Sequence, residues 1–405
     1  MSGIVIIGAG HAGGSCAGFL RQYGYQGPIC LIGSESVPPY QRPPLSKAWL
    51  SADMDEDDLY LKGPDFYALN QIDLRLGTTV QMIDAETRHV VLSSGDSIPY
   101  EYLVIATGTK LKPLAYKGAD EVGYYQLYQM HQAKALASQL KQGARIGIIG
   151  TGYIALEVAA TAIKHGLKVS VFGRGERLLR RVASLSMANH LKSIHENKGV
   201  SFYLNSSISH LSQSLTHEKC LHFDNGDEMR FDLLLAGIGA VPDNSLAKAC
   251  GLRGHSDIVV DHEARSSNPH IFAIGDVTSR PLSPHYEGLH HLESVPNALE
   301  QAKQAAAAIA GSKPPMVDVP WFWSDQYEHK LQIAGLLQAD STLIERRHET
   351  GVSFLHLTRD HRLSFAECLN NPSDFMASKL LIAKKIKLDP TDLSERPLKS
   401  YLTLT

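Results

Sequence analysis

The sequence predicts an α/β fold in which two similar units built on parallel sheets are followed by a smaller α+β module. Short apolar runs of the kind found in buried strands recur along the chain, with Ala- and Leu-rich helical stretches between them. The order strand, glycine turn, helix, strand occurs at residues 4–32 and again at 146–172. After Pro320 the chain changes to an aromatic cluster followed by short strand-like stretches, which is typical of an antiparallel module.

The individual elements follow from these patterns. The apolar runs predict buried strands at 4–7, 29–32, 103–106, 146–149, 169–172, 233–236 and 271–274. Residues 302–311 are rich in alanine and predict a helix that ends at a glycine, and the two prolines that follow predict a linker. Beyond the linker, residues 331–336 and 352–357 are predicted strands.

Length and composition exclude several classes of protein. At about 150 residues per domain, 405 residues predict two or three domains. A hydrophobic content of 43%, a charged content of 20% and a net charge of -3 are typical of a soluble globular protein, and they argue against a nucleic-acid-binding surface. Neither a secretory signal nor an apolar run of about 18 residues occurs, so we expect no export and no membrane span.

Cysteine spacing bears on redox chemistry and on metals. The five cysteines lie far apart and include no C-x-x-C pair. This spacing argues against a disulfide framework, a zinc ribbon and a thioredoxin-like redox pair. We therefore expect reduced thiols, a cytoplasmic location and no metal site in this chain, while the oligomeric state stays open.

A glycine-rich turn follows the first predicted strand. Gly8, Gly10 and Gly13 form the pattern G-x-G-x-x-G, in which the glycines permit a tight turn, close approach of a pyrophosphate, and close packing of helix on strand. Glu35 lies 22 residues beyond Gly13, at the end of the second apolar run, where a carboxylate can bind an adenosine ribose. Such a motif alone also occurs in turns that only connect a strand to a helix, but this context favours a dinucleotide site.

A second copy of the turn begins 142 residues later. It consists of Gly150, Gly152 and Ala155, and alanine is an accepted variant at the third position. Two such turns imply two dinucleotides. Because nicotinamide transfers only hydride and the chain offers no other electron sink, we expect FAD in the first site and NADH or NADPH in the second.

Further motifs extend the pattern over nearly the whole chain. They are Pro39-Tyr40-x-Arg42-Pro43-Pro44-Leu45-Ser46-Lys47, Ala106-Thr107-Gly108, Gly150-x-Gly152-Tyr153-Ile154-Ala155-Leu156-Glu157, Ile271-Phe272-Ala273-Ile274-Gly275-Asp276-Val277, Glu293-Ser294-Val295-Pro296-Asn297-Ala298 and Pro320-Trp321-Phe322-Trp323-Ser324-Asp325-Gln326-Tyr327. In this order they resemble the ferredoxin reductases of the putidaredoxin reductase type, flavoproteins that serve Rieske oxygenases and bacterial cytochromes P450.

The resemblance implies a glutathione-reductase-like architecture. It comprises two interleaved Rossmann-like dinucleotide-binding domains and a C-terminal α+β domain. On this basis we predict an FAD-binding domain at 1–113 and 242–316, an NAD(P)H-binding domain at 114–241, and a C-terminal interface domain at 317–405.

The resemblance also implies roles around the flavin. Arg42 and Lys47 would belong to the FAD site, with the Lys47 ammonium near flavin N5 and paired with Glu157. A fixed positive charge there favours the electron-rich reduced flavin, and the carboxylate lowers the cost of burying the ammonium. Asp276 would bind the ribityl hydroxyls, although an aspartate after a strand is as often a helix N-cap.

Other positions of the FAD site follow in the same way. By resemblance, Thr107 and Gly108 bring backbone near the phosphates or the flavin, and Val295 lies near the flavin ring. Trp323, with Trp321 as a second candidate, would project toward the flavin or toward the surface where the electron acceptor docks. The alternative is an aromatic cluster that fills a domain interface.

The nicotinamide site departs from the family pattern. Gly150, Gly152, Tyr153 and Ile154 supply the expected cofactor contacts, but the acidic residue that many members carry at the end of the following strand is missing. Arg174, with Arg177 as a second candidate, is placed to bind a 2'-phosphate. The hypothesis is that NADPH is used at least as well as NADH; alternatively, Arg174 stacks on adenine or lies in solvent.

The predicted function is an NAD(P)H:ferredoxin oxidoreductase, in which hydride passes to FAD and electrons then leave one at a time to a [2Fe-2S] ferredoxin that serves an oxygenase. A basic run near the C-terminus and the pair Arg346-Arg347 would steer an acidic ferredoxin, unless they are only solvated charges. The alternatives are a rubredoxin reductase or NADH oxidase on the same fold, and a redox-sensing protein resembling apoptosis-inducing factor.

Overall fold

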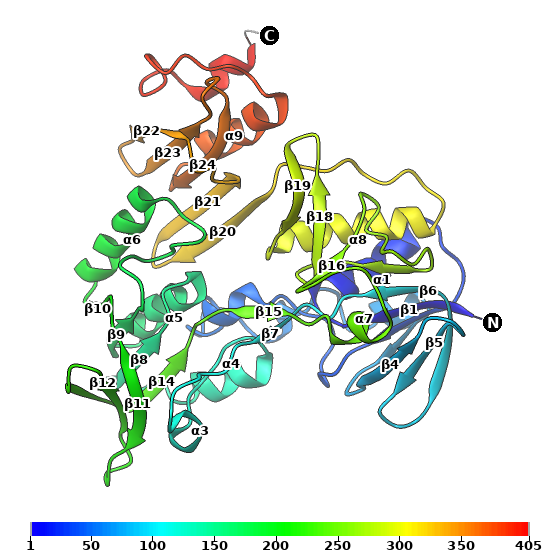
Figure 1. The fold of residues 1–405 in the computed structure, drawn as a ribbon, viewed down its shortest axis with the longest axis horizontal. Coiled ribbons are helices and arrows are strands. Elements are labelled where there is room, and N and C mark those ends of the chain that lie inside the picture. Colours follow the sequence, from blue (N-terminus) through cyan, green and yellow to red (C-terminus); the bar gives the residue numbers. More distant parts are fainter. Residues whose placement is uncertain (1, 404–405) are drawn as a thin grey trace. The chain divides into compact units, whose positions relative to one another are not determined.

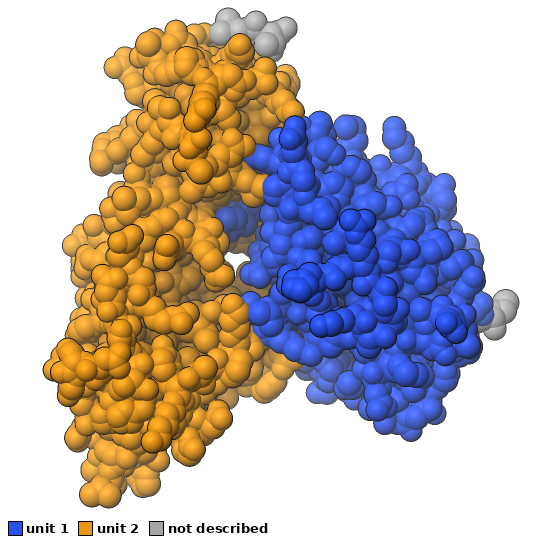
Figure 2. All heavy atoms as spheres, viewed as in Figure 1, with its two compact units in different colours: residues 1–41, 56–110, 240–322 blue, residues 42–55, 111–239, 323–405 orange. Residues whose placement is uncertain are grey.

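The computed structural model describes residues 2–403, which form two compact units (Figures 1 and 2). Unit 1 comprises the chain up to residue 41 together with 56–110 and 240–322. Unit 2 comprises 42–55, 111–239 and the chain from residue 323 onward. Each unit is thus assembled from three separate segments.

Unit 1 is built on a mixed sheet with the strand order β3-β2-β1-β6-β5-β4, and β17 pairs with β6 in addition. The strands are β1 (Gly3–Ile7), β2 (Ile29–Ile32), β3 (Ile72–Arg75), β4 (Val80–Asp84), β5 (His89–Leu92), β6 (Ser97–Ile105) and β17 (Ile271–Ala273). The strands β1, β2, β3, β17 and the end of β6 run parallel, whereas β4 and β5 form an antiparallel extension. Every residue of β1 and β2 is buried, as expected for parallel strands covered on both faces.

Alternate residues of β1 enter two different cores. Ile4 and Ile6 pack in the cluster that contains residues of α1 (His11–Gln22) and α8 (Val295–Ile309). Val5 and Ile7 pack in a second cluster on the opposite face, with residues of β4, β5 and α7 (Ser245–Ala249). The remaining elements of unit 1 are η2 (Asp57–Leu59), α2 (Phe66–Leu69), β7 (Thr109–Leu111), β15 (Ala240–Pro242), β16 (Ile258–Val259), β18 (Thr278–Leu282) and β19 (Tyr286–His291).

Unit 2 contains a second parallel sheet, with the order β10-β9-β8-β14. Its strands are β8 (Arg145–Ile149), β9 (Lys168–Phe172), β10 (Ser201–Tyr203) and β14 (Leu233–Ala236). A small antiparallel sheet follows, made of β11 (Ile208–Gln213), β12 (Lys219–Phe223) and β13 (Glu228–Phe231). The helical elements are η1 (Pro43–Ser46), α3 (Ala119–Val122), α4 (Met130–Ala137), α5 (Tyr153–Lys164) and α6 (Leu185–Asn197).

The C-terminal part of unit 2 is a five-stranded sheet with the order β20-β21-β24-β23-β22 (Figure 1). Its elements are β20 (Trp321–Gln326), β21 (His329–Gly335), β22 (Thr342–Arg347), β23 (Val352–Leu357), β24 (Leu363–Leu369), α9 (Pro372–Lys384) and η3 (Leu398–Thr403). The strands β21 to β24 pair antiparallel. All residues of β23 and β24 are buried, so both faces of this part of the sheet are covered.

The predicted elements are present, with two differences in extent. The strand expected at 103–106 is the last part of the longer β6, and the helix expected at 302–311 is the last part of α8. The helix stops before Gly311, whose φ of +69° is readily adopted only by glycine. Among the described residues, no helix is long and apolar enough to cross a membrane. The predicted domain boundaries stay a prediction.

One expectation about surface charge is wrong. Arg346 is buried on β22, where its guanidinium pairs with the Asp374 carboxylate at 2.9 Å and donates to the Arg396 carbonyl at 3.0 Å. Because arginine is rarely buried unless it is paired, this side chain ties β22 to α9 and to the C-terminal segment. Arg346 therefore cannot steer a partner protein, whereas Lys384, Lys385 and Lys387 are exposed.

Candidate active site

The first glycine turn connects β1 to α1 in unit 1. Gly8 has a φ of +108°, and a Cβ there would lie 2.2 Å from the Ala106 carbonyl oxygen. A Cβ at Gly13 would lie 1.9 Å from the Gly8 carbonyl oxygen, so the helix packs directly on the turn. No side chain caps α1 at Gly10 and no acidic residue lies in its first turn, whereas Ser294 caps α8. The first amides of α1 therefore suit an anionic phosphate group.

Two further predicted residues, Glu35 and Thr107, are brought to this turn. A Cβ at Gly33 would lie 2.6 Å from the Ala9 side chain, which places the end of β2 and the nearby Glu35 beside the turn. The half-buried Glu35 carboxylate accepts a hydrogen bond from the Tyr40 hydroxyl at 2.8 Å. Thr107 directly follows Ala106, whose carbonyl oxygen packs against Gly8.

The segment containing Asp276 also lies next to α1. A Cβ at Gly275 would lie 3.1 Å from the Cβ of Ala12. No helix follows Asp276, which sits in the turn between β17 and β18, so the alternative role as a helix N-cap is wrong. The predicted role of Asp276 toward the ribityl hydroxyls stays a prediction.

A buried amide cluster supports this turn from α8. The Gln301 amide oxygen accepts hydrogen bonds from the Gly275 backbone at 2.8 Å and from the Thr278 hydroxyl at 3.0 Å. The Gln301 Nε2 and Asn297 Oδ1 atoms are buried and have no hydrogen-bond partner among the described residues. Since buried polar atoms are normally paired, these atoms fit a site where a polar group binds. The residues present around the first turn therefore fit a dinucleotide.

Thr107, Gly108 and Val295 have mainly backbone roles. The Thr107 hydroxyl donates to the Asp243 carbonyl at 2.7 Å, and the Gly108 carbonyl accepts from the Asp243 amide at 2.8 Å. Val295 is the first residue of α8, directly after the capping Ser294. The Thr107 side chain therefore holds the chain near residue 243, and its approach to a cofactor would be through the backbone.

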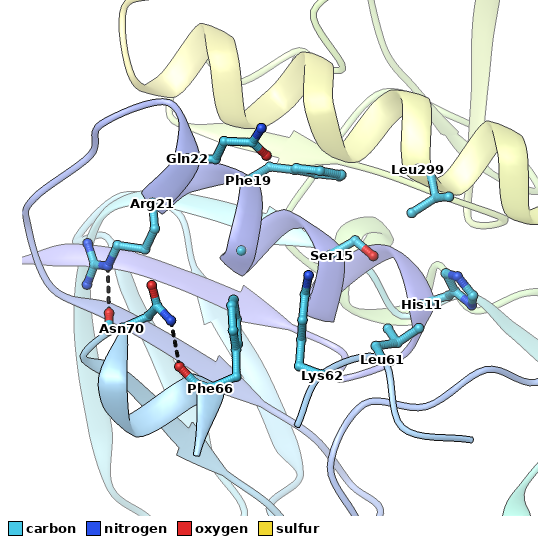
Figure 3. A pocket seen from close by; sticks show the side chains of 11 residues that line it. His11, Ser15, Phe19, Arg21, Gln22, Leu61, Lys62, Phe66, Asn70 and Leu299 are labelled. Carbon is cyan, nitrogen blue, oxygen red and sulfur yellow. Dashed lines mark hydrogen bonds between the residues drawn. The ribbon is translucent and has the colours of Figure 1, made fainter. Parts of the chain in front are cut away.

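A groove of about 480 Å³ runs along α1 in the same unit (Figure 3). One face of α1 lines it, from His11 to Gln22, together with residues of the segment 61–70 and Leu299 of α8. Figure 3 shows Lys62 and Phe66 side by side, both extending toward α1, and the Lys62 ammonium lies 4.9 Å from the centre of the Phe66 ring. Because His11 follows Gly10, the groove begins at the first glycine turn.

The second glycine turn, in unit 2, repeats this geometry. Gly150 has a φ of +130°, and a Cβ there would lie 2.1 Å from the Gly237 carbonyl oxygen. A Cβ at Gly152 would meet nothing within 4 Å, so this position borders open space. Helix α5 starts at Gly152 without a capping side chain or an acidic residue in its first turn. These features fit a second dinucleotide approaching Gly152.

The side chains around the second turn differ in whether they are exposed to contact a ligand. Ile154 is 48% exposed, whereas Tyr153 points inward and burial raises the pKa of its hydroxyl. The Arg177 guanidinium donates to the Ala183 and Arg180 carbonyls, each at 3.0 Å. Arg174 is exposed and has no hydrogen bond or ion pair within residues 2–403. Of the two predicted arginines, Arg177 therefore shapes its loop and Arg174 is available to a ligand.

Lys47 and Glu157 lie together within unit 2. The Lys47 ammonium is 2.8 Å from the Glu157 carboxylate and also donates to the Pro43 carbonyl at 3.2 Å. Glu157 is only 4% exposed. One helical turn further along α5, the Thr161 hydroxyl donates to the Ser46 carbonyl at 2.9 Å, so one face of α5 holds the Lys47 segment. The predicted pair is thus in place, with a buried carboxylate and a half-buried ammonium.

Residues that sequence reasoning missed surround Glu157. The Ser46 and Ser324 hydroxyls donate to its two carboxylate oxygens, at 2.5 Å and 2.6 Å. Ser324 accepts from the amide of Gln326, which in turn faces His195 of α6. The signal in the sequence was the alternation of Ser324 and Gln326 on the strand that begins with three aromatic residues.

Arg42 and Trp323 belong to unit 2 as well. The Arg42 guanidinium donates to the Tyr128 carbonyl and lies 4.1 Å from the centre of the Tyr128 ring. Trp323 is half-buried on β20, next to Ser324. Their predicted contacts with FAD stay predictions.

The cysteines take no part in this site. Cys16 and Cys30 are buried, and burial raises the pKa of each thiol to about 12. A thiol of such high pKa holds almost no thiolate at neutral pH and is a poor nucleophile. Within the described part of the chain, no group of three or more histidine, cysteine or acidic side chains could hold a metal ion.

Comparison with known proteins agrees with this arrangement. Residues 2–302 match the family described as pyridine nucleotide-disulphide oxidoreductase, and residues 321–402 match the family described as reductase C-terminal. Putidaredoxin reductase CamA of Pseudomonas putida is 36% identical over 98% of this chain and 96% of its own length. The chain belongs to the putidaredoxin reductase-like ferredoxin reductases. This family uses FAD and NAD(P)H, in agreement with the two glycine turns.

Other members of the family are similarly close. A probable ferredoxin reductase, CtmF, of Castellaniella defragrans is 38% identical over 96% of each chain. A crystal structure of the covalent putidaredoxin reductase–putidaredoxin complex matches with a TM-score of 0.95 at 34% identity, covering 100% of this chain and 98% of that chain. The predicted fold class and the resemblance to this family are confirmed.

Proposed function

We propose that this ferredoxin reductase takes electrons from NAD(P)H, passes them through FAD, and delivers them singly to a [2Fe-2S] ferredoxin that serves an oxygenase. The observation that carries the proposal is the presence of two uncapped glycine turns in one chain, at Gly8–Gly13 and at 150–155. Membership of the ferredoxin reductases supplies the acceptor class.

The cofactor roles divide between the two turns. The first turn, with Glu35, Asp276 and the buried amides of Asn297 and Gln301, would hold FAD. FAD, when bound, accepts a hydride from the nicotinamide and releases electrons singly. The second turn, at Gly152, would hold the nicotinamide nucleotide.

The protein contributes placement and charge rather than acid–base chemistry. Lys47 would lie at the flavin, where a fixed ammonium favours the electron-rich reduced state. Its pairing with Glu157 lowers the cost of holding that charge in a half-buried position. The buried, high-pKa thiols argue against a dithiol relay, so electrons would leave toward the ferredoxin without passing through the chain's cysteines.

We propose further that NADPH is accepted at least as well as NADH. Arg174 is exposed just beyond the end of β9. Gly173 and Arg174 directly follow β9, in place of the acidic residue expected at the strand end for NADH, and the first carboxylate after the strand is that of Glu176. Guanidinium groups bind a 2'-phosphate with charge-assisted hydrogen bonds.

The test is cytochrome c reduction by the purified protein with NADH or NADPH, in the presence and absence of candidate [2Fe-2S] ferredoxins. The expected result is a rate that depends on added ferredoxin. An equal rate without ferredoxin, or rapid oxidation of NAD(P)H by oxygen alone, would instead favour an oxidase.

A further inference from the structure

Two polar side chains are buried on the strand that also carries Trp323. Ser324 and Gln326 alternate along β20 and face inward, at 0% and 3% exposure. Burying hydroxyl and amide groups costs free energy unless their hydrogen bonds are satisfied. Their partners, Glu157 and His195, are also buried, so all four side chains belong to one internal cluster of unit 2.

The direction of each hydrogen bond in this cluster is fixed by Glu157. A carboxylate can only accept, and it accepts from Ser46 and Lys47 at one oxygen and from Ser324 at the other. Ser324 has one hydroxyl proton and uses it on Glu157. Its oxygen must therefore accept from the Gln326 amide nitrogen, 3.0 Å away.

The hydrogen bonds of Gln326 and His195 have the same direction. With its nitrogen used on Ser324, the Gln326 amide oxygen faces His195 Nε2 at 2.8 Å and must accept a proton from it. His195 then carries its proton on Nε2, and its Nδ1 accepts from the Tyr327 hydroxyl at 2.9 Å. Every donor in the series Tyr327, His195, Gln326, Ser324 points toward Glu157.

His195 has the protonation state that this direction requires. It is fully buried on α6, and burial lowers the pKa of its imidazole to about 4. A neutral imidazole has one donor and one acceptor nitrogen, as the series demands.

The backbone at Tyr327 is strained in a way that serves the same contact. Tyr327 has a φ of +56°, a left-handed conformation that a non-glycine residue adopts only at a cost in free energy. Glycine would relieve this strain at the turn between β20 and β21, but it would remove the hydroxyl that reaches His195. The backbone conformation alone would favour glycine here, so the contact of the Tyr327 hydroxyl with His195 offsets the strain.

Docking of α6 does not depend on His195. At the N-terminus of α6, the Ser184 backbone amide donates to the buried Glu367 carboxylate at 3.0 Å. Beyond its last turn, Lys198 pairs with Glu328 at 2.9 Å. Because the helix is tied to the C-terminal sheet at both ends, the His195 contact is not needed to attach it.

We propose that His195, Gln326 and Ser324 act as positioning residues, forming a one-directional hydrogen-bond series that orients the Glu157 carboxylate against Lys47. This inference rests on the proposed function only for the consequence at the flavin. The series itself concerns contacts within unit 2.

The first test is the tautomer of His195 in the FAD-loaded protein, read from ¹⁵N chemical shifts of labelled histidine. The expected result is the Nε2-protonated tautomer in the wild type and a mixture of tautomers in Ser324→Ala, because Gln326 is then free to turn over. Protonation at Nδ1 in the wild type, or an unchanged tautomer in Ser324→Ala, would overturn the proposal.

The second test is the rate of flavin reduction by NAD(P)H. In His195→Phe we expect the limiting rate to fall about tenfold with KM unchanged, the effect of losing one hydrogen bond that orients a charged group. His195→Gln, which has both a donor and an acceptor, is expected to restore most of the rate. The matched control is His190→Gln on the same helix, outside the series, and it should leave the rate unchanged.

The outcomes separate the two proposals. An unchanged limiting rate in His195→Phe, or no recovery in His195→Gln, would overturn the positioning role. If the wild type reduced no ferredoxin, the proposed function would fail, but the tautomer measurement needs no ferredoxin and would still decide the series. If His195→Phe failed to fold, Ser324→Ala and the wild-type spectrum would still test it.

Discussion

The two glycine turns have the same backbone geometry but opposite charge at the end of the following strand. In both, the first glycine has a positive φ and packs against a carbonyl of a neighbouring strand end, and in both the helix starts without a cap. The first unit then places the carboxylate of Glu35 beside its turn, whereas the second has the exposed guanidinium of Arg174. The comparison suggests that the shared geometry serves the pyrophosphate and that the differing charge selects the nucleotide.

The third position of the motif shows how each unit makes room for its helix. In the first unit, Gly13 packs on the Gly8 carbonyl with no space for a side chain. In the second unit the third position is Ala155, and the space comes from Gly237, where a Cβ would lie 2.9 Å from that of Ala155. The same packing requirement is therefore met by different glycines.

Gly13→Ala is expected to have the largest effect. A Cβ 1.9 Å from the Gly8 carbonyl oxygen forces the turn open, so the protein should be purified without flavin. The measurement is the ratio of flavin to protein absorbance. Its counterpart, Ala155→Gly, should keep the flavin and lose about 1 kcal/mol in free energy of unfolding. If Gly13→Ala were purified with bound flavin, the third position of the first motif would tolerate a side chain as the second motif does, and the proposed difference would be wrong.

Gly152→Ala should separate binding from folding in the second unit. The new Cβ enters open space, so flavin content and melting temperature should stay at wild-type values. The KM for the nicotinamide nucleotide should rise roughly tenfold or more, because the methyl group occupies the path of the pyrophosphate. Steady-state kinetics and a thermal melt check both parts. Unchanged kinetics would mean that the nucleotide does not approach Gly152.

Exchange of charge at Arg174 tests the selectivity argument directly. Arg174→Ala should lower kcat/KM for NADPH about tenfold relative to NADH, by removing a charge-assisted contact. Arg174→Glu should place a carboxylate near the second turn, as Glu35 does near the first, and favour NADH further. If a strong preference for NADH already exists in the wild type and Arg174→Ala leaves it unchanged, the NADPH proposal fails.

Glu35→Gln should give the smallest effect. The amide still accepts from the Tyr40 hydroxyl and can accept from a ribose hydroxyl, so only the charge is lost. We expect FAD to dissociate a few-fold faster, as measured by flavin release in a mild chaotrope. Loss of all bound FAD would mean that charge, not hydrogen bonding, dominates at this position.

Both turns and the Lys47–Glu157 pair were predictable from the sequence because they are local motifs or parts of one ordered family pattern. The strands β1, β2, β8 and β9 were predictable because continuous apolar runs report burial on both faces. The hydrogen bonds that the Thr107 and Arg177 side chains donate to backbone carbonyls were not predictable. Their acceptors, Asp243 and Ala183, come near only in the folded chain.

The cluster around Glu157 lay beyond sequence reasoning for the same reason. Its members come from η1, α5, α6 and β20, and no spacing along the chain connects them. The burial of Arg346 was missed because a pair of arginines is usually exposed, and only the position of Asp374 on α9 reverses that expectation.

The most direct test of two nucleotides in one chain is an anaerobic titration of the purified protein with NADH and with NADPH. We expect one FAD per chain, bleached by about one equivalent of reduced nicotinamide, since hydride carries two electrons. A colourless protein that cannot be reconstituted with FAD, or a flavin that neither nucleotide bleaches, would contradict this expectation.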